Sequence, residues 1–192
     1  IIKNKQNKVM LISHFDPNDL GKKGFIPDKI NKFYKIIDEY CLSTKTTLMI
    51  ALRSKRRDKS YKIKDEINYF NSILSCKKKF NLRDKNSYIT GSNSELIINY
   101  HSNLGFELLS RKFKVLFLPF HETKLPKVNY LEKKDNLHIH RNENKVQIFK
   151  KINFLLSYKK RSWDKKIKNK QYLINFEPEN KTFNKIISSH FK

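Results

Sequence analysis

The sequence has few cysteines, few acidic residues and no long apolar run. Its two cysteines, Cys41 and Cys76, are far apart in sequence, and neither belongs to a CxxC pair that could bind zinc or exchange disulfides. This usage favours a reduced, cytoplasmic protein. No apolar run reaches about 18 residues, the length a membrane-spanning helix needs, and neither an internal repeat nor a low-complexity linker is present.

Acidic residues are outnumbered by basic ones. There are 42 Lys and Arg against 18 Asp and Glu, which gives a formal net charge of +24. Such a charge attracts nucleic acid, anionic lipid and phosphorylated ligands. A nucleic-acid footprint, however, gathers basic residues on one face among exposed aromatic side chains, whereas here they lie along the whole chain. A basic nucleic-acid-binding module is therefore the weaker alternative, and peripheral contact with an anionic membrane stays open.

Short apolar runs alternate with helical patterns along the chain. Strands are predicted at 9–15, 46–52, 95–100 and 114–120, with a short edge strand at 137–140. Helices are predicted at 28–41, 65–74, 103–111 and 146–156, with a last one at 183–187. Asp28 is placed to cap the first helix. The alternation predicts an α/β fold, a Rossmann-like three-layer domain with a mainly parallel sheet and right-handed crossovers.

Polar residues follow three of the predicted strands, at 14–19, 53–57 and 101–107. In an open α/β sheet, ligands bind beyond the carboxyl ends of the strands, where free backbone N–H groups meet the positive end of a helix dipole. We therefore treat these segments as the candidate ligand site. The third is the most informative, because its polar turn leads directly into a helix.

The turn at 101–107 carries groups that suit a nucleotide. Ser102 and Asn103 can cap the helix and donate to a phosphate oxygen, and Gly105 allows a backbone to come close in the first turn. Glu107, about one turn into the helix, can accept two hydrogen bonds from ribose hydroxyls. On spacing alone, an ordinary helix cap with a glutamate near the dipole's positive end, stabilising by about 1 kcal/mol, is the stronger interpretation.

A family resemblance shifts that balance. Residues 87–120, SYITGSNSELIINYHSNLGFELLSRKFKVLFLPF, resemble a segment of GT-B-like surface carbohydrate (O-antigen or capsule) biosynthesis glycosyltransferases. That segment reads approximately S-Y, a short helix, a strand, S-T-L-G-Y-E, a helix and a second strand. The spacing from Ser87-Tyr88 to Ser102 agrees with it without gaps.

The resemblance extends over nearly the whole chain. VMLISHF is similar to the family's opening strand, and LMIALRS followed by DEINYF is similar to its strand, arginine and Glu-plus-aromatic helix. Downstream, LLSYKKRSWDKKI resembles a helix end with a Trp segment, and INFEPENKTFNKII resembles the closing motif. Each motif is weakly specific, but their order and spacing agree.

The resemblance implies the C-terminal half of a GT-B glycosyltransferase. In such a half the Ser-containing turn holds the donor diphosphate and the helix glutamate holds the ribose, which by motif matching are Ser102, Asn103 and Glu107. Arg53 is placed by resemblance to face the phosphates, where its planar fork suits bidentate binding, although a solvated basic loop fits equally well. His101 and His14 are further candidate ligand contacts.

Three positions depart from the family pattern. Asn103 replaces the usual Thr, His101 stands where Asp is common, and Glu177 takes the place of an Asp. Asn103 still supplies a capping oxygen and an amide donor, so phosphate binding survives the change. His101 either contacts the ligand or fills the strand end.

The implied function is transfer of a sugar from a nucleotide-diphosphate donor to a glycan or lipid-linked acceptor. The nucleotide sugar is a substrate, so no cofactor and no metal is expected, and the catalytic base is unknown because the N-terminal half commonly supplies it. Nucleotide-sugar epimerisation and polyol-phosphate transfer use the same geometry and stay as alternatives. We expect residues 1–192 to form one Rossmann-like nucleotide-sugar-binding domain without its N-terminal half, with 157–192 as a C-terminal helical segment.

Two other features have competing interpretations. His138 and His140 would share one side of an extended strand, and with His121 or His101 could bind a metal, but surface histidines on an edge strand are the stronger interpretation. Trp163, the only tryptophan, lies among basic residues and is either an interfacial anchor or, more strongly, a packing residue.

Overall fold

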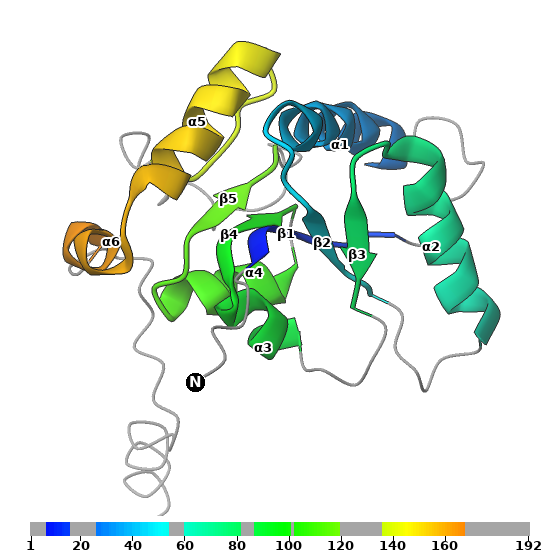
Figure 1. Ribbon diagram of the computed structural model, residues 1–192, viewed down its shortest axis with the longest axis horizontal. Helices are drawn as coiled ribbons and strands as arrows, with labels where there is room; N and C mark the ends of the chain where they lie inside the picture. The colour runs from blue at the N-terminus through cyan, green and yellow to red at the C-terminus, as the bar shows by residue number, and fades with distance from the viewer. Residues whose placement is uncertain are drawn as a thin grey trace, which may run out of the picture.

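The computed structural model describes residues 7–15, 26–53, 60–81, 87–100, 102–119 and 136–167. Strands and helices alternate through most of this part of the chain (Figure 1). In chain order the elements are β1 (Asn7–Ile12), α1 (Ile26–Ser43), β2 (Leu48–Ala51), α2 (Ser60–Ile73), β3 (Lys78–Phe80), α3 (Ser87–Ser92), β4 (Ser94–Asn99), α4 (Asn103–Ser110), β5 (Val115–Phe117), α5 (Lys145–Ser157) and α6 (Lys160–Ile167).

The strands form one parallel sheet in the order β3-β2-β1-β4-β5. β1 is central, and its Leu11 lies opposite Ile50 of β2 and Ile98 of β4. The chain moves outward from β1 in one direction through β2 and β3, and in the other through β4 and β5. The order therefore reverses between β1 and β4, where open α/β sheets bind their ligands.

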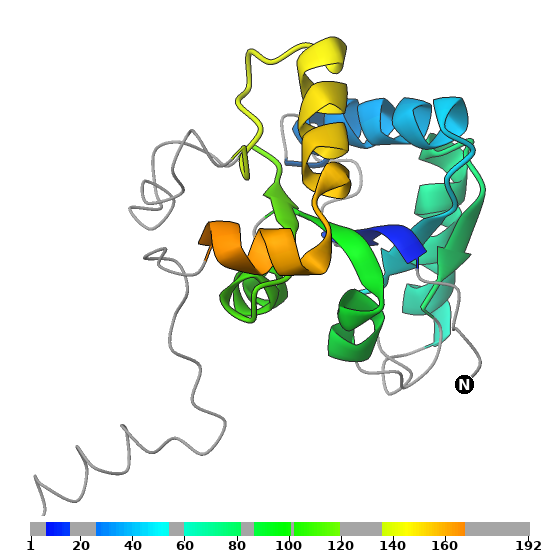
Figure 2. The same cartoon turned by 60° about the vertical axis from the view of Figure 1, so that its left-hand side comes forward.

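Helices cover both faces of the sheet, as the continuous apolar strands require. α1 and α5 pack beside each other on one face, and α3 and α4 lie side by side on the other (Figures 1 and 2). The predicted Rossmann-like three-layer α/β fold is confirmed.

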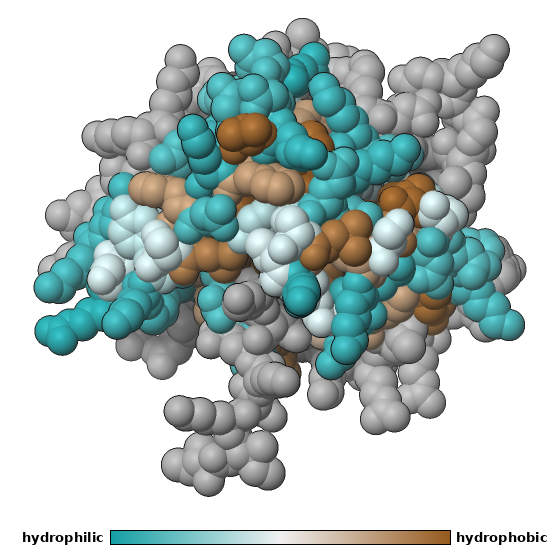
Figure 3. Space-filling view, turned by 45° about the horizontal axis from the view of Figure 1, so that its top comes forward, coloured by the Kyte–Doolittle hydropathy of each residue, from teal (hydrophilic) through white to brown (hydrophobic). Residues whose placement is uncertain are grey.

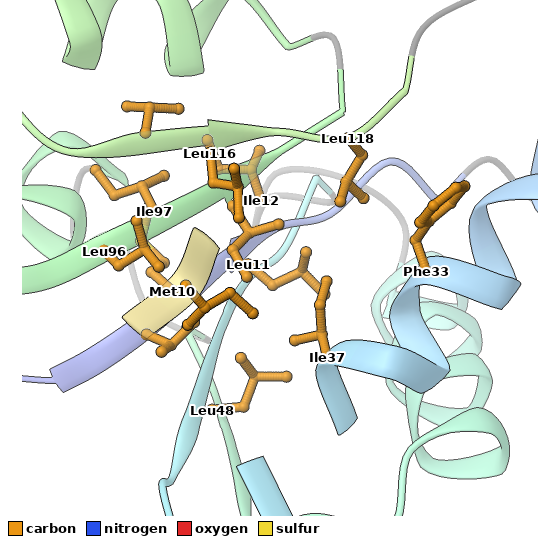
Figure 4. Packing of buried hydrophobic residues seen from close by; sticks show 14 of the residues in the cluster. Met10, Leu11, Ile12, Phe33, Ile37, Leu48, Leu96, Ile97, Leu116 and Leu118 are labelled. Atoms are coloured by element: carbon orange, nitrogen blue, oxygen red, sulfur yellow. The ribbon is translucent and has the colours of Figure 1, made fainter. Parts of the chain in front are cut away.

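The core lies where these layers meet. Met10, Leu11 and Ile97 of the central strands are fully buried, and Ile37 of α1 points toward Leu11, while Phe33 lies on the side of Leu118 (Figure 4). The helix aromatics Tyr34 and Phe70 are also buried and contact one another, with ring centroids 5.8 Å apart. These aromatics are thus core residues and do not form an exposed stacking surface.

Two free cysteines meet in this core although they are far apart in sequence. Cys41 of α1 and Cys76, which follows α2, are both buried. A side-chain hydrogen bond with Cys41, and then burial, raise the pKa of the Cys76 thiol above its ordinary value. Asp38 accepts hydrogen bonds from the backbone N–H groups of Ser75 and Cys76 and so fixes this end of α2 against α1.

Several element boundaries differ from the sequence-based expectation. α1 begins at Ile26, so Asp28 lies inside the helix and is not its N-cap. Pro27 occupies the first turn, where its fixed φ and missing N–H are tolerated. The predicted edge strand at 137–140 is reduced to one parallel bridge between Phe117 and His138. The predicted helix at 183–187 lies outside the described residues.

The sequence pattern gives no bounds for three of the elements, one of which, α6, lies within the expected helical segment 157–192. β3 is short and carries Lys78 and Lys79, which suit the edge of a sheet but hide the apolar alternation of a strand. α3 matches the short helix that the family resemblance implies. α6 holds Trp163, which is fully buried and donates from Nε1 to the Lys112 carbonyl oxygen at 2.9 Å. Trp163 is therefore a packing residue.

The surface mixes apolar and hydrophilic side chains (Figure 3). Among the described residues, the large apolar side chains that stand exposed are Leu42, Ile89 and Val146, and these belong to three different helices. Within the same part of the chain, no helix combines the length and the apolar character needed to cross a membrane.

Candidate functional site

The carboxyl ends of β1 and β4 meet at the point where the strand order reverses. His14, after β1, contacts Tyr100, after β4, edge to face, with ring centroids 5.2 Å apart at 61°. Tyr34 of α1 is buried, and burial raises the pKa of its hydroxyl above the ordinary value. His14, the first residue of the 14–19 segment, therefore lies against Tyr100, the residue that precedes the 101–107 segment. His101 itself lies outside the described residues.

Asn99 shapes the turn that leads from β4 into α4. Its side chain is fully buried, accepts a hydrogen bond from the Ser102 N–H at 3.1 Å and donates from Nδ2 to the Ser102 carbonyl oxygen at 3.1 Å. This pair of bonds closes the turn and fixes where α4 begins. Asn99 is not among the predicted site residues, and its signal in the sequence is a polar residue at the end of the apolar strand ELIIN.

The helix cap differs from the expected one. Ser102 occupies the N-cap position with extended backbone, φ −67° and ψ 137°, but its side chain makes no capping hydrogen bond. Asn103 is the first residue of α4 and its side chain is exposed. The turn is thus held by the two hydrogen bonds of the Asn99 side chain, while Ser102 and Asn103 lie at the positive end of the helix dipole.

Gly105 is required by close packing in the first turn of α4. A Cβ atom on this residue would lie 2.1 Å from Asn99 Nδ2 and 2.7 Å from Asn99 Cβ. The sequence predicted that Gly105 admits a close approach. The approaching group is the Asn99 side chain.

Glu107 is already engaged by a neighbouring helix. The Tyr88 hydroxyl of α3 donates to Glu107 Oε2, and both side chains are half-buried. The guanidinium carbon of Arg111, the C-cap residue of α4, lies 5.1 Å from the centroid of the Tyr88 ring. Nothing in the spacing of the sequence links Tyr88 to Glu107.

Arg53 joins β2 to β1 at the same edge of the sheet. Its backbone N–H donates to Oε1 of Glu66 at 2.8 Å, and Glu66 is fully buried. Its guanidinium Nη1 donates to the Phe15 carbonyl oxygen at 3.3 Å, so the side chain extends toward the end of β1. The arginine of LMIALRS and the glutamate of DEINYF, two separate motifs in the sequence, are therefore bonded to each other.

The histidines beside β5 form a separate cluster. The rings of His138 and His140 meet edge to face with centroids 5.0 Å apart, and Lys151 donates to the His138 carbonyl oxygen at 2.5 Å. Burial, followed by His140 and Lys151, lowers the pKa of His138 to about 4. Within the described residues, no group of three or more His, Cys, Asp or Glu is arranged to hold a metal ion. His121 lies outside that part of the chain.

No protein-family model matches the chain, and no curated protein matches it in sequence. Its fold is similar to two solved structures of the UDP-GlcNAc 2-epimerase of Methanocaldococcus jannaschii. The complex with UDP-GlcNAc and UDP has a TM-score of 0.57 and 13% identity, over 96% of this chain and 46% of that chain. The other has a TM-score of 0.52 and 14% identity, over 85% and 45%. The chain thus spans about half the length of these structures, whose fold is GT-B-like.

Proposed function

We propose that the chain is the nucleotide-binding half of a glycosyltransferase of bacterial surface-polysaccharide biosynthesis. The observation that carries this proposal is the turn braced by Asn99, which places Ser102, Asn103 and the amino end of α4 beside the carboxyl end of β1. A helix that starts at a topological switch point is a general solution for binding phosphate groups. The similarity in fold to an enzyme solved with UDP and UDP-GlcNAc supports the same ligand class.

Each element of the site has a role in this proposal. The donor diphosphate binds at the amino end of α4, where backbone N–H groups and the side chains of Ser102 and Asn103 donate to it. Arg53 adds positive charge from the end of β2, and Glu107 accepts from the ribose. When the bond from sugar to diphosphate breaks, the N–H groups of α4, the side chains of Ser102 and Asn103, and Arg53 stabilise the charge on the leaving group without a tightly bound metal.

The other substrate in this proposal is a growing cell-surface glycan or its lipid-linked precursor. The enzyme works in the cytoplasm, at the inner face of the membrane, where its net charge of +24 favours contact with anionic lipid. The catalytic base comes from the half of a GT-B enzyme that faces this one.

Nucleotide-sugar epimerisation is the second candidate function. It is favoured by one observation, the similarity in fold to a UDP-GlcNAc 2-epimerase. A donor labelled in its sugar separates the two candidates. An epimerase converts the labelled donor with no acceptor present, whereas a transferase releases the nucleoside diphosphate and moves the label to an acceptor. Polyol-phosphate transfer would instead move a labelled phosphate.

Calorimetry on the full-length protein that carries this chain tests the binding site. Among UDP, GDP, CDP and dTDP, at least one is expected to bind, and Glu107→Ala is expected to weaken that binding roughly tenfold or more through loss of hydrogen bonds to a charged group. Glu39→Ala is the matched control, because Glu39 is a half-exposed glutamate that pairs with Lys145 between α1 and α5, away from the site. If none of the four diphosphates binds, the proposal is wrong.

A further inference from the structure

We propose that Tyr88 is the positioning residue for Glu107 and thereby sets the preference of the site for a ribose that carries its hydroxyls. This inference rests on the proposed function, because it assigns a role within the same nucleotide site. Tyr88 lies outside the β4–α4 turn. It belongs to α3, which precedes β4 in the chain and packs beside α4.

The topology brings Tyr88 to the correct edge of the sheet. α3 leads into β4 and packs beside α4, and Asn81, which follows β3 at the carboxyl edge of the sheet, donates to Thr90 of α3. α4 starts at that same edge. Tyr88, in the first turn of α3, is therefore level with Glu107, which lies about one turn into α4.

α3 is held firmly enough to fix a side chain on its neighbour. Asn81 Nδ2 donates to Thr90 Oγ1 at 2.9 Å, and Ser94 Oγ donates to the Thr90 carbonyl oxygen at 2.8 Å. On the α4 side, Gly91 packs so closely that a Cβ atom there would lie 2.8 Å from Leu108 Cδ1. The backbone under Tyr88 is thus tied to β3, to β4 and to α4.

The tyrosine is held from both ends. Its hydroxyl donates to Glu107 Oε2, and the Arg111 guanidinium lies over its ring at 5.1 Å. A hydrogen bond to a charged acceptor is stronger than a neutral one, and a cation over an aromatic face adds further attraction. Glu107 lies in α4 and Arg111 caps its carboxyl end four residues later, so the three side chains form one cluster between α3 and α4.

The consequence is a carboxylate that is oriented before the ligand arrives. A glutamate on a helix surface rotates among several side-chain conformations, and fixing it on binding costs entropy. With Tyr88 bonded to one oxygen, that cost is met on folding, and a ribose hydroxyl meets an aligned acceptor. Removing the Tyr88 hydroxyl should therefore weaken the site specifically for ligands that carry ribose hydroxyls.

The test compares the best-binding nucleoside diphosphate with its 2′,3′-dideoxy form, in wild type and in Tyr88→Phe, by calorimetry on the full-length protein. Wild type should prefer the hydroxylated form, and Tyr88→Phe should reduce that preference by roughly three- to tenfold, the range expected for one hydrogen bond to a charged group. Binding of the dideoxy form should not change. A purely structural role would weaken both forms alike.

Tyr40→Phe is the matched control, because the Tyr40 hydroxyl donates to Asn153 Oδ1 at 2.7 Å between α1 and α5, outside the site. It should leave the preference unchanged. In a Glu107→Gln background, Tyr88→Phe should have no further effect on the preference, because the residue it positions has changed. If Tyr88→Phe does not fold, Arg111→Met releases the tyrosine ring while keeping its hydroxyl, and should reduce the preference to a smaller extent.

The outcomes separate the two proposals. If no diphosphate binds wild type, the proposed function fails and this inference with it. If wild type prefers the hydroxylated form and Tyr88→Phe keeps that preference in full, Tyr88 does not position Glu107, while the proposed function stands. If Tyr88→Phe binds the hydroxylated form more tightly than wild type does, the tyrosine competes with ribose for Glu107, and the positioning role is wrong.

Discussion

Asn99 and Gly105 are in mutual contact at the start of α4, where the Asn99 amide occupies the space that a side chain on residue 105 would need. Two hydrogen bonds to Ser102 hold this amide in place, so it cannot turn away. The position of the candidate phosphate-binding turn therefore depends on a buried amide and on a missing side chain.

Gly105→Ala should destabilise the protein. Alanine favours a helix, but its Cβ atom would displace the pinned Asn99 side chain, and such overpacking typically costs about 1–3 kcal/mol. Gly91→Ala is the control in another helix, because the Cβ atom there meets the end of the Leu108 side chain, which can change its rotamer. Urea denaturation should show the larger loss for Gly105→Ala. A Gly105→Ala protein as stable as wild type would contradict the close packing.

Asn99→Ala should mainly reduce stability, whereas Asn103→Ala should mainly reduce diphosphate binding. Asn99 is fully buried with two hydrogen bonds to the turn, so its loss should cost about 1–3 kcal/mol of unfolding free energy. Asn103 is exposed at the helix start, so its loss should change stability by less than about 0.5 kcal/mol. In the proposed site, Asn103→Ala should instead weaken diphosphate binding in calorimetry. Equal effects of the two changes on stability would show that Asn99 does not brace the turn.

His138 should make stability depend on pH below neutrality. Burial is the largest cause that lowers its pKa from 6.5 to about 4, so the unfolded chain binds a proton at a pH where the folded chain does not. Stability from this group is therefore present above pH 6.5 and is lost as the pH falls toward 4. His140 and Lys151 act in the same direction, while Glu143 opposes them.

His138→Gln should reduce this dependence. We expect the fall in melting temperature between pH 7 and pH 5 to be smaller in the variant than in wild type, as measured by thermal denaturation followed by circular dichroism. Titrating groups that do not contact His138 contribute alike to both proteins and cancel in the comparison. An unchanged fall would mean that His138 titrates alike in the folded and unfolded chains.

The sequence predicted the layers of this fold well because burial leaves a simple pattern. The apolar residues of β1 and of β4 follow one another without alternation, since both faces of the sheet are covered, and α1 carries its buried residues at helical spacing. β3 was not predicted because it is short and carries two lysines. At the edge of the sheet these side chains can reach solvent, so the strand lacks an apolar pattern. A short edge strand has too few buried positions to leave a pattern.

The candidate site was predicted only as far as local sequence allows. The turn at 101–107 was found because strand, polar residues and helix follow one another in the chain. The contacts that define it were not, because Tyr88 with Glu107 and Arg53 with Glu66 join different elements. Such pairs follow from the packing of α3 on α4 and from the hydrogen bond between α2 and the residues after β2, which spacing in one sequence does not encode.

Trp163 should report whether α6 is docked on the rest of the domain. Its indole is fully buried and donates to the Lys112 carbonyl oxygen, so Trp163→Ala should cost about 3–5 kcal/mol, the range for removing a large buried aromatic side chain. Trp163→Phe keeps most of the buried area and loses one hydrogen bond, so it should cost less, about 1–2 kcal/mol.

Trp163 is also the only tryptophan of the chain, so its fluorescence can be assigned without ambiguity as the difference between wild type and Trp163→Phe. That difference spectrum should be blue-shifted and protected from iodide in the native protein, because the ring lies in the core. Lys166 lies 5.8 Å from the Tyr158 ring, and Tyr158 in turn contacts Trp163, so α6 is held through aromatic contacts as well as through the indole hydrogen bond. An emission maximum typical of exposed tryptophan, or full quenching by iodide, would show that α6 does not pack as a part of this core.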